Sequence, residues 1–171
     1  MNVEIKKDQN LESEPLLSPM TVVGSVFAHS RLETFPKDGK FLQDFFRKSK
    51  ENKCYCNLLQ DFVFSEVDVY PYSRKLASSL QNLELAHSLT WTCSGGMRAS
   101  KYRMNKESRD QEIEIAFKKD PSKKTQKLLK ELGQDFKKAS KDFYIQEEKE
   151  IEESLIRPRK KKSFTIFSSK K

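Results

Sequence analysis

Residues 120–156 have the sequence DPSKKTQKLLKELGQDFKKASKDFYIQEEKEIEESLI, and this stretch indicates the fold class most clearly. Its apolar residues recur every three or four positions, which is the period of an amphipathic helix. Asp120 offers a helix-capping side chain, and Pro121 suits the first helical position. We therefore expect one long helix over 121–156, ended by Pro158.

One face of this predicted helix is apolar. Its residues are Leu128, Leu129, Leu132, Phe136, Ala139 and Phe143. Lysines dominate the first half of the helix and glutamates the second, which runs against the helix dipole. Because a helix gains most of its stability by packing its apolar face, we expect this face to bind a partner protein.

Two further helices are predicted upstream. The first begins near Asp38 and places four apolar residues on one face; they are Phe41, Leu42, Phe45 and Phe46. The second lies within 73–90, where Leu76, Leu80, Leu83 and Ala86 recur at intervals of four, three and three. These patterns add two short helices to the long one.

Extended structure is expected in two places. Residues 21–28 contain three valines and a phenylalanine, which favours a short strand or an extended arm. Residues 58–70 are rich in strand formers, with Val67 and Val69 alternating with acids, and predict a short β-hairpin ended by Pro71.

The expected fold is mainly α, small and partly disordered, with three or four helices, a possible short β-hairpin and a long C-terminal amphipathic helix. Charged residues make up 34% of the chain, against roughly 25% in ordinary domains. Such a chain buries little apolar surface to offset the entropy of ordering. We divide it into a disordered N-terminal segment (1–20), a small mixed core region (21–93), a basic linker (94–110), an amphipathic helical region (111–156) and a polybasic tail (157–171).

Several localisation signals are missing from the sequence. No apolar run approaches the roughly 20 residues that span a bilayer. The N-terminus lacks a secretory apolar stretch, and Asn2 stands where a myristoylation signal has glycine. Three irregularly spaced cysteines do not suggest a disulfide framework. We expect an intracellular protein without integral membrane association.

The sequence supplies few groups for catalysis. It has two histidines, neither in a recognisable nucleophile or metal signature, and no phosphate-binding glycine loop. Cys54, Cys56, His87 and Cys93 are zinc-type residues, but their spacing does not match that of zinc sites. We expect neither an enzyme nor a bound metal or cofactor.

The tail is the most informative segment for function. Residues 157–171 contain seven cations and no acid. Five of the cations cluster around Pro158 in a pattern typical of a nuclear import signal, and the same charges would bind nucleic-acid phosphates. These candidate import or polyanion-binding residues are Arg157, Arg159, Lys160, Lys161 and Lys162.

The tail also mixes cations with Phe164, Ile166 and Phe167. In this respect residues 160–171 resemble the effector segment of the myristoylated alanine-rich kinase-substrate family. The resemblance implies binding to an anionic membrane surface, at about 1 kcal/mol per cation. Ser163, preceded by Lys160 to Lys162 and followed by Phe164, fits the pattern of a basophilic kinase target, and a phosphate there would weaken binding by the neighbouring cations. Ser18, which precedes a proline, is a second candidate.

A second basic patch precedes the long helix. It consists of Arg98, Lys101, Arg103, Lys106 and Arg109. If this segment is helical, most of these cations share one side, beside Tyr102. A basic stripe next to an aromatic ring suits nucleic acid or an acidic protein surface.

Three functions remain open. The first is a nuclear interaction protein, in which the tail contacts an import receptor, the 121–156 helix binds a partner protein and the second patch adds nucleic-acid contacts. The second is a cytoskeletal or ciliary protein bound to the acidic surface of microtubules. The third is a peripheral binder of anionic membranes, regulated by phosphorylation of the tail.

Overall fold

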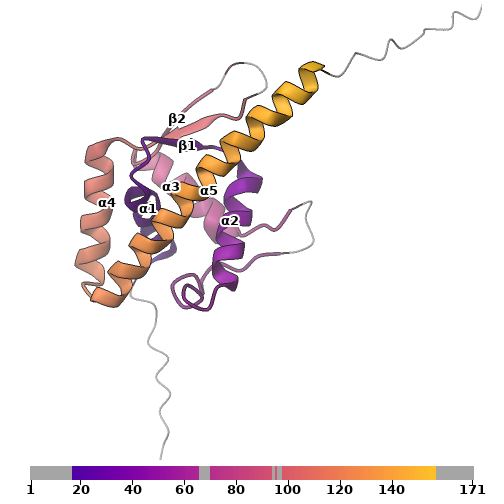
Figure 1. The fold of residues 1–171 in the computed structure, drawn as a ribbon. Helices are drawn as coiled ribbons and strands as arrows, with labels where there is room; N and C mark the ends of the chain where they lie inside the picture. Colours follow the sequence, from indigo (N-terminus) through magenta and orange to yellow (C-terminus); the bar gives the residue numbers. More distant parts are fainter. Residues whose placement is uncertain (1–16, 66–69, 94, 96–97, 157–171) are drawn as a thin grey trace, which may run out of the picture.

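The computed structural model describes residues 17–65, 70–93, 95 and 98–156 (Figure 1). This part of the chain is mainly helical, as predicted. The helices are α1 (Pro19–Ser30), α2 (Gly39–Glu51), α3 (Arg74–Leu85), α4 (Lys106–Lys119) and α5 (Lys123–Ile156). The strands are β1 (Thr34–Pro36), β2 (Thr90–Thr92) and β3 (Lys101–Arg103).

Helix α1 lies at the centre of the fold and packs against α3, α4 and α5. The prediction of a strand or extended arm at 21–28 is wrong, as is that of disorder at 17–20. Ser18 caps the helix by accepting a hydrogen bond from the Thr21 amide, and Pro19 takes the first helical position. Because helices surround α1, it is buried on nearly every side, and its sequence lacks an amphipathic period.

Helices α2 and α3 are confirmed close to their predicted positions. Asp38 caps α2 with a 2.7 Å hydrogen bond from the Phe41 amide to its carboxylate. Ser73 caps α3 in the same way, through the amide of Leu76. In both helices the predicted apolar faces turn into the core, with Phe46 and Leu76 fully buried, except that Ala86 is exposed just beyond the end of α3.

The sheet is antiparallel, with β3 between β1 and β2. On β3, Tyr102 lies opposite Phe35 of β1 and Trp91 of β2. The three-stranded sheet does not form in the hairpin predicted at 58–70. Residues 66–69, with Val67 and Val69, lie outside the described residues; of the others, residues 58–61 make turns and a bridge joins Ser65 to Tyr72. The sheet strands were missed because three-residue strands are too short to display an alternating pattern.

The long C-terminal helix predicted over 121–156 is confirmed as α5, and α4 ends just before it at Lys119. Asp120 is the C-cap residue of α4 and does not cap the long helix, contrary to the prediction from the sequence. Ser122 takes that role, because its hydroxyl accepts a hydrogen bond from the Thr125 amide at the start of α5. The chain bends at Pro121 between them. The segment predicted as a basic linker contains β3 and the first turn of α4.

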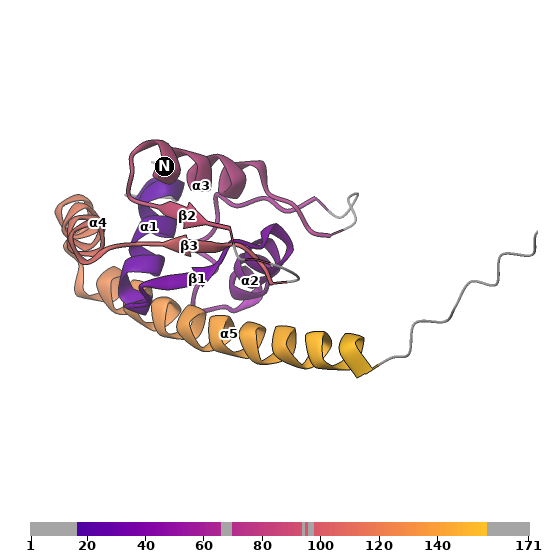
Figure 2. The same cartoon turned by 90° about the horizontal axis from the view of Figure 1, so that it is seen from above.

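The predicted partner-binding face of α5 packs into the chain's own core. Leu129, Leu132 and Phe136 are fully buried, whereas Leu128, Ala139 and Phe143 are partly buried. The Phe136 ring lies 4.9 Å from that of Phe27 and 5.1 Å from that of Phe45, centroid to centroid. Figure 2 shows α5 along one side of the sheet, α3 on the other, and the end of α5 projecting beyond the body.

Candidate nucleic-acid interface

Helix α3 presents a polar, uncovered surface. Leu76, Leu80 and Leu83 face the core at intervals of four and three residues. The opposite side carries five exposed polar residues, which we call the α3 outer face: Arg74, Lys75, Ser78, Gln81 and Asn82. Their side chains supply cationic, amide and hydroxyl groups, which are the groups that contact bases and phosphates in nucleic-acid complexes.

A buried amide fixes the start of α3. The Gln43 side chain from α2 accepts a 2.8 Å hydrogen bond from the Ser73 amide and donates one of 3.4 Å to the Ser73 carbonyl. Gln43 is 3% exposed, so these bonds are shielded from water. The first residues of the α3 outer face therefore project from a rigid helix terminus.

The acidic residue of α3 is turned away from this face. Glu84 accepts a hydrogen bond from the Tyr102 hydroxyl, and its carboxylate lies 3.4 Å from the Lys37 ammonium. Burial, and then the bond to Glu84, raises the pKa of Tyr102 well above its usual value, so the phenol stays protonated at neutral pH. The carboxylate is thus neutralised within the body of the protein.

The β2–β3 hairpin adds a second surface to the same region. Trp91 on β2 is 48% exposed, and the Lys37 ammonium lies 3.9 Å from the centroid of its ring. This hairpin is connected to α3 through Glu84, which contacts both Tyr102 of β3 and Lys37. An exposed aromatic beside a cation is a surface on which a base or a sugar can stack.

The second basic patch is distributed over this hairpin and α4, and its β3 residues are extended rather than helical. Lys101 lies 5.0 Å from the Tyr144 ring of α5, and Arg103 pairs with Glu33 at 2.7 Å. Arg109 donates to the carbonyls of residues 32 and 104. Arg98 and Lys106 are exposed and make no ion pair with the described residues.

Helix α5 carries a separate basic surface. Five lysines at helical spacing share one side of the helix, four of them exposed and Lys137 partly buried. We call them the α5 lysine face: Lys123, Lys127, Lys130, Lys137 and Lys141. Lys127 pairs with Glu131 at 3.7 Å. Since α5 lies on the opposite side of the sheet from α3 (Figure 2), the two basic surfaces cannot contact the same short ligand.

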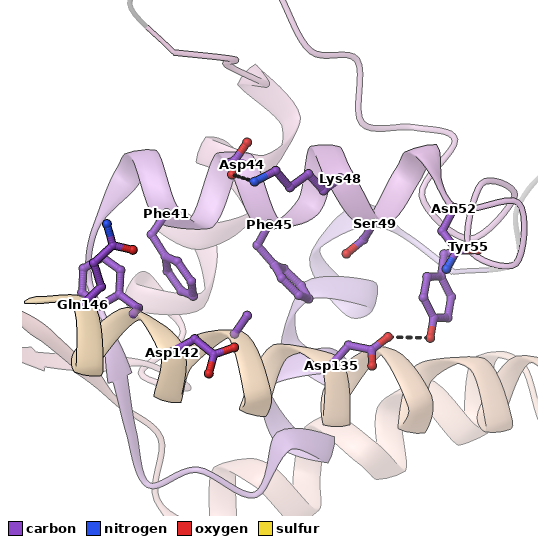
Figure 3. A pocket seen from close by; sticks show the side chains of 12 residues that line it. Phe41, Asp44, Phe45, Lys48, Ser49, Asn52, Tyr55, Asp135, Asp142 and Gln146 are labelled. Atoms are coloured by element: carbon purple, nitrogen blue, oxygen red, sulfur yellow. Dashed lines mark hydrogen bonds and ion pairs between the residues drawn. The ribbon is translucent and has the colours of Figure 1, made fainter.

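An open groove of about 460 Å³ lies between α2 and α5 (Figure 3). Phe41 and Phe45 of α2 point toward α5, and Ala139 and Phe143 of α5 also line the groove, with the Phe143 ring 4.9 Å from that of Phe41. The Tyr55 hydroxyl donates a 2.8 Å hydrogen bond to the Asp135 carboxylate at one end. No local sequence pattern predicts this groove, because residues from two helices far apart in the sequence form it.

The remaining predicted sites lie elsewhere. Arg157, Arg159 and Lys160 to Lys162, with Ser163, fall outside the described residues. Ser18 is exposed, but its hydroxyl lies 2.8 Å from that of Thr21 within the helix cap. Phosphorylation of either serine stays a prediction.

Neither metal ligands nor membrane spans are found in the described part of the chain. Its acidic, cysteine and histidine side chains form no group of three or more that could hold a metal ion, and the zinc-type residues are not brought together. Among the same residues, no helix is both long and apolar enough to cross a bilayer.

The α3 outer face was not predicted from the sequence, although the helix that carries it was. The polar residues at positions 74, 78, 81 and 82, which alternate with the leucines, could have predicted this face. A polar helix face is usually only a solvated surface, and nothing in the sequence revealed the hairpin beside it. No protein-family model, curated protein or solved structure matches this chain.

Proposed function

We propose that this protein is a non-enzymatic DNA-binding protein that contacts a duplex through the α3 outer face and the β2–β3 hairpin. The observation that carries the proposal is the α3 outer face itself. It combines Arg74 and Lys75 at the start of a rigid helix with Gln81 and Asn82 further along. Glu84 is paired inward, and Lys75 lies 3.4 Å from the Asp61 carboxylate.

The order of the elements supports this proposal. The succession α1–β1–α2–α3–β2–β3, with β3 central in the sheet, is the element order of winged-helix domains. In the related helix-turn-helix proteins, the second helix of the motif enters the major groove. Helix α3 holds that position here, although its connection to α2 is longer than the usual turn. This chain is compared with winged-helix domains in the order of its elements alone, and the comparison is an analogy.

The chemistry of the face fits a duplex. Arginine and lysine pair with phosphates or with guanine, and glutamine and asparagine pair with the edge of adenine in the major groove. An α-helix fits the width of that groove. The tail would add phosphate contacts of low sequence preference and direct the protein to the nucleus.

The test compares two double variants that lose the same charge. Full-length protein carrying Arg74→Ala and Lys75→Ala is titrated against a pool of mixed-sequence duplexes, beside protein carrying Lys130→Ala and Lys137→Ala. We expect the first pair to weaken binding about tenfold or more near physiological salt, and the second to have a smaller effect. Because both retain the tail, its contribution cancels in the comparison. Normal binding by the first variant would overturn the proposal.

The α5 lysine face favours a second candidate function. A row of lysines on one rigid helix matches an extended acidic surface, such as that of a microtubule. Under this function, co-sedimentation with microtubules would be lost in the Lys130→Ala, Lys137→Ala variant and retained when α3 is altered. The reverse pattern, or no co-sedimentation by the unaltered protein, would remove this candidate.

Nuclear targeting is tested separately from DNA binding. We expect a fluorescently tagged full-length chain to concentrate in the nucleus and a chain lacking residues 157–171 to lose that distribution. A nuclear distribution unchanged by the deletion would show that the tail is not the nuclear localisation signal. Recruitment to the cell periphery instead would favour the peripheral membrane function.

A further inference from the structure

The α2–α5 groove combines an aromatic floor with acidic groups. Phe41, Phe45 and Phe143 line it, and Asp142 and Asp135 stand on its α5 edge (Figure 3). Neither aspartate has an ion pair with a described residue. The volume of about 460 Å³ lies within the range of about 300–1,000 Å³ found for ligand pockets.

The other edge of the groove is close to neutral. Asp44 of α2 lies 2.6 Å from the Lys48 ammonium and 3.1 Å from the Arg47 guanidinium. Burial acts to raise the pKa of Asp44, but these two partners outweigh it, so its pKa is lowered and it stays ionised. The uncompensated charge of the groove is therefore the negative charge of α5.

The acidic edge of α5 continues beyond the groove toward the end of the helix. Gln146, Glu150 and Glu153 follow Asp142 at intervals of four, four and three residues, which places them on the same side. Residues 142–156 contain six acids and one lysine. A cationic chain running back along α5 from residue 157 would meet Glu153, Glu150 and Asp142, with the neutral Gln146 before the last of them.

This chain contains a segment of complementary composition. Residues 160–167 carry three lysines, followed by Phe164, Ile166 and Phe167. The lysines match the acidic edge, and the aromatic and aliphatic side chains match the floor of phenylalanine rings.

The tail is also long enough to reach the groove. The groove residues Ala139 and Gln146 lie 17 and 10 positions before the end of α5, which corresponds to about 26 and 15 Å along the helix. Phe164 follows Ile156 by eight residues, and an extended chain of that length spans about 26 Å. A tail that reverses direction after α5 therefore brings Phe164 to the groove.

We propose that residues 160–167 of the chain's own tail dock into the α2–α5 groove, antiparallel to the end of α5. Docking places the tail lysines on acids of the same molecule and so hides them from nuclear receptors and polyanions. A phosphate on Ser163 would face the acidic edge, and the resulting repulsion would release the tail. This device does not depend on the proposed DNA-binding function.

The experiment uses the full-length chain with a photoreactive phenylalanine derivative, p-benzoylphenylalanine, in place of Phe164. After irradiation of a dilute sample, mass spectrometry identifies the residues joined to position 164. We expect cross-links within one chain to residues 41–49 of α2 and 135–146 of α5. Cross-links scattered over the surface, or found only between two chains, would overturn the proposal.

Two charge variants make the test specific. Asp142→Lys with Gln146→Lys alters the groove edge, whereas Asp110→Lys with Gln111→Lys makes the same charge change at exposed positions of α4. We expect the first to lower the cross-link yield about fivefold, because each exposed ion pair lost changes an equilibrium by up to about that factor. The second should leave the yield unchanged. Equal yields in the two variants would contradict the proposed role of the acidic edge.

Discussion

The Glu112 carboxylate on α4 accepts a 2.7 Å hydrogen bond from the hydroxyl of Ser88, which lies in the turn after α3. Glu112 is 3% exposed and lies directly against Gly24 of the central helix. Burial raises its pKa above the ordinary value, and the Ser88 bond and the charge of Lys119 only partly oppose this shift. One acid thus joins α1, the end of α3 and α4.

Replacing Glu112 with glutamine should stabilise the protein at neutral pH. A carboxyl group whose pKa is raised in the folded state favours folding while protonated, and this stability is lost as the pH rises from the unfolded value through the folded one. Since glutamine does not ionise, we expect a Tm about 2–4 °C higher at neutral pH, for roughly 1 kcal/mol. Below the unfolded pKa of Glu112 the difference should disappear.

Glu114→Gln on the same helix is the control for this experiment. Its hydrogen bond and ion pair with Lys118 lower the pKa of Glu114, which is the opposite direction. We expect this variant to gain no stability at neutral pH. Thermal unfolding followed from acid to neutral pH measures both variants, and a constant offset for Glu112→Gln across that range would refute the assignment.

Gly133→Ala should destabilise the crossing of α5 over α1. A Cβ atom at position 133 would lie 2.6 Å from the Cβ of His29 and 2.9 Å from the carbonyl oxygen of Val26. Overpacking of this kind costs about 1–3 kcal/mol, which exceeds the gain of about 1 kcal/mol from the helix propensity of alanine. Urea denaturation measures the balance of the two effects.

Gly39→Ala provides the matched control. It lies at the start of α2, where an added Cβ would be 3.4 Å from the hydroxyl of Tyr70, an ordinary contact. We expect it to be neutral or slightly stabilising. If both glycine variants were equally stable, the close approach of the two helices would be wrong.

The face of α5 that the sequence suggested for a partner should behave as core. Phe136 is fully buried, and its ring contacts those of Phe27, Phe35 and Phe45 in tilted or edge-to-face geometry. Phe136→Ala should therefore cost about 3–5 kcal/mol of unfolding free energy. Phe117→Ala on α4, where the ring is 55% exposed, should change it by less than about 0.5 kcal/mol. Equal stability of the two variants would place Phe136 outside the core.

The same residue illustrates what the sequence could predict. Spacing identifies a helix face such as that of Phe136, because the period is local, but it cannot say which molecule covers that face. The helix that covers it is α1, whose residues 21–28 were predicted from the sequence to be extended. Val22, Val23 and Val26 favour strands, and burial on every side removes the amphipathic period.

The candidate site was predictable only in part. Ser73 and the leucines of α3 located the helix, and its polar residues could have been read as a face. The pairing of Glu84 with Lys37 and Tyr102 distinguishes this face from an ordinary solvated helix surface. These two partners are 47 and 18 residues away from Glu84 in the sequence. Contacts between such distant residues follow from the tertiary fold and leave no local pattern.

Single substitutions on the α3 outer face should separate positioning contacts from base contacts. We expect Arg74→Ala, if the side chain contacts a phosphate, to weaken binding to all duplexes alike and to reduce the slope of log K against log salt by about 1. Gln81→Ala should instead keep the salt slope and lose about 1–3 kcal/mol of discrimination between a preferred duplex and a mismatched one. Selection from a random duplex pool supplies the preferred sequence, and fluorescence anisotropy at several salt concentrations measures both quantities. Lys124→Ala, an exposed cation on α5, should reproduce neither effect. Identical salt slopes and identical discrimination in all three variants would exclude α3 as the element that reads DNA.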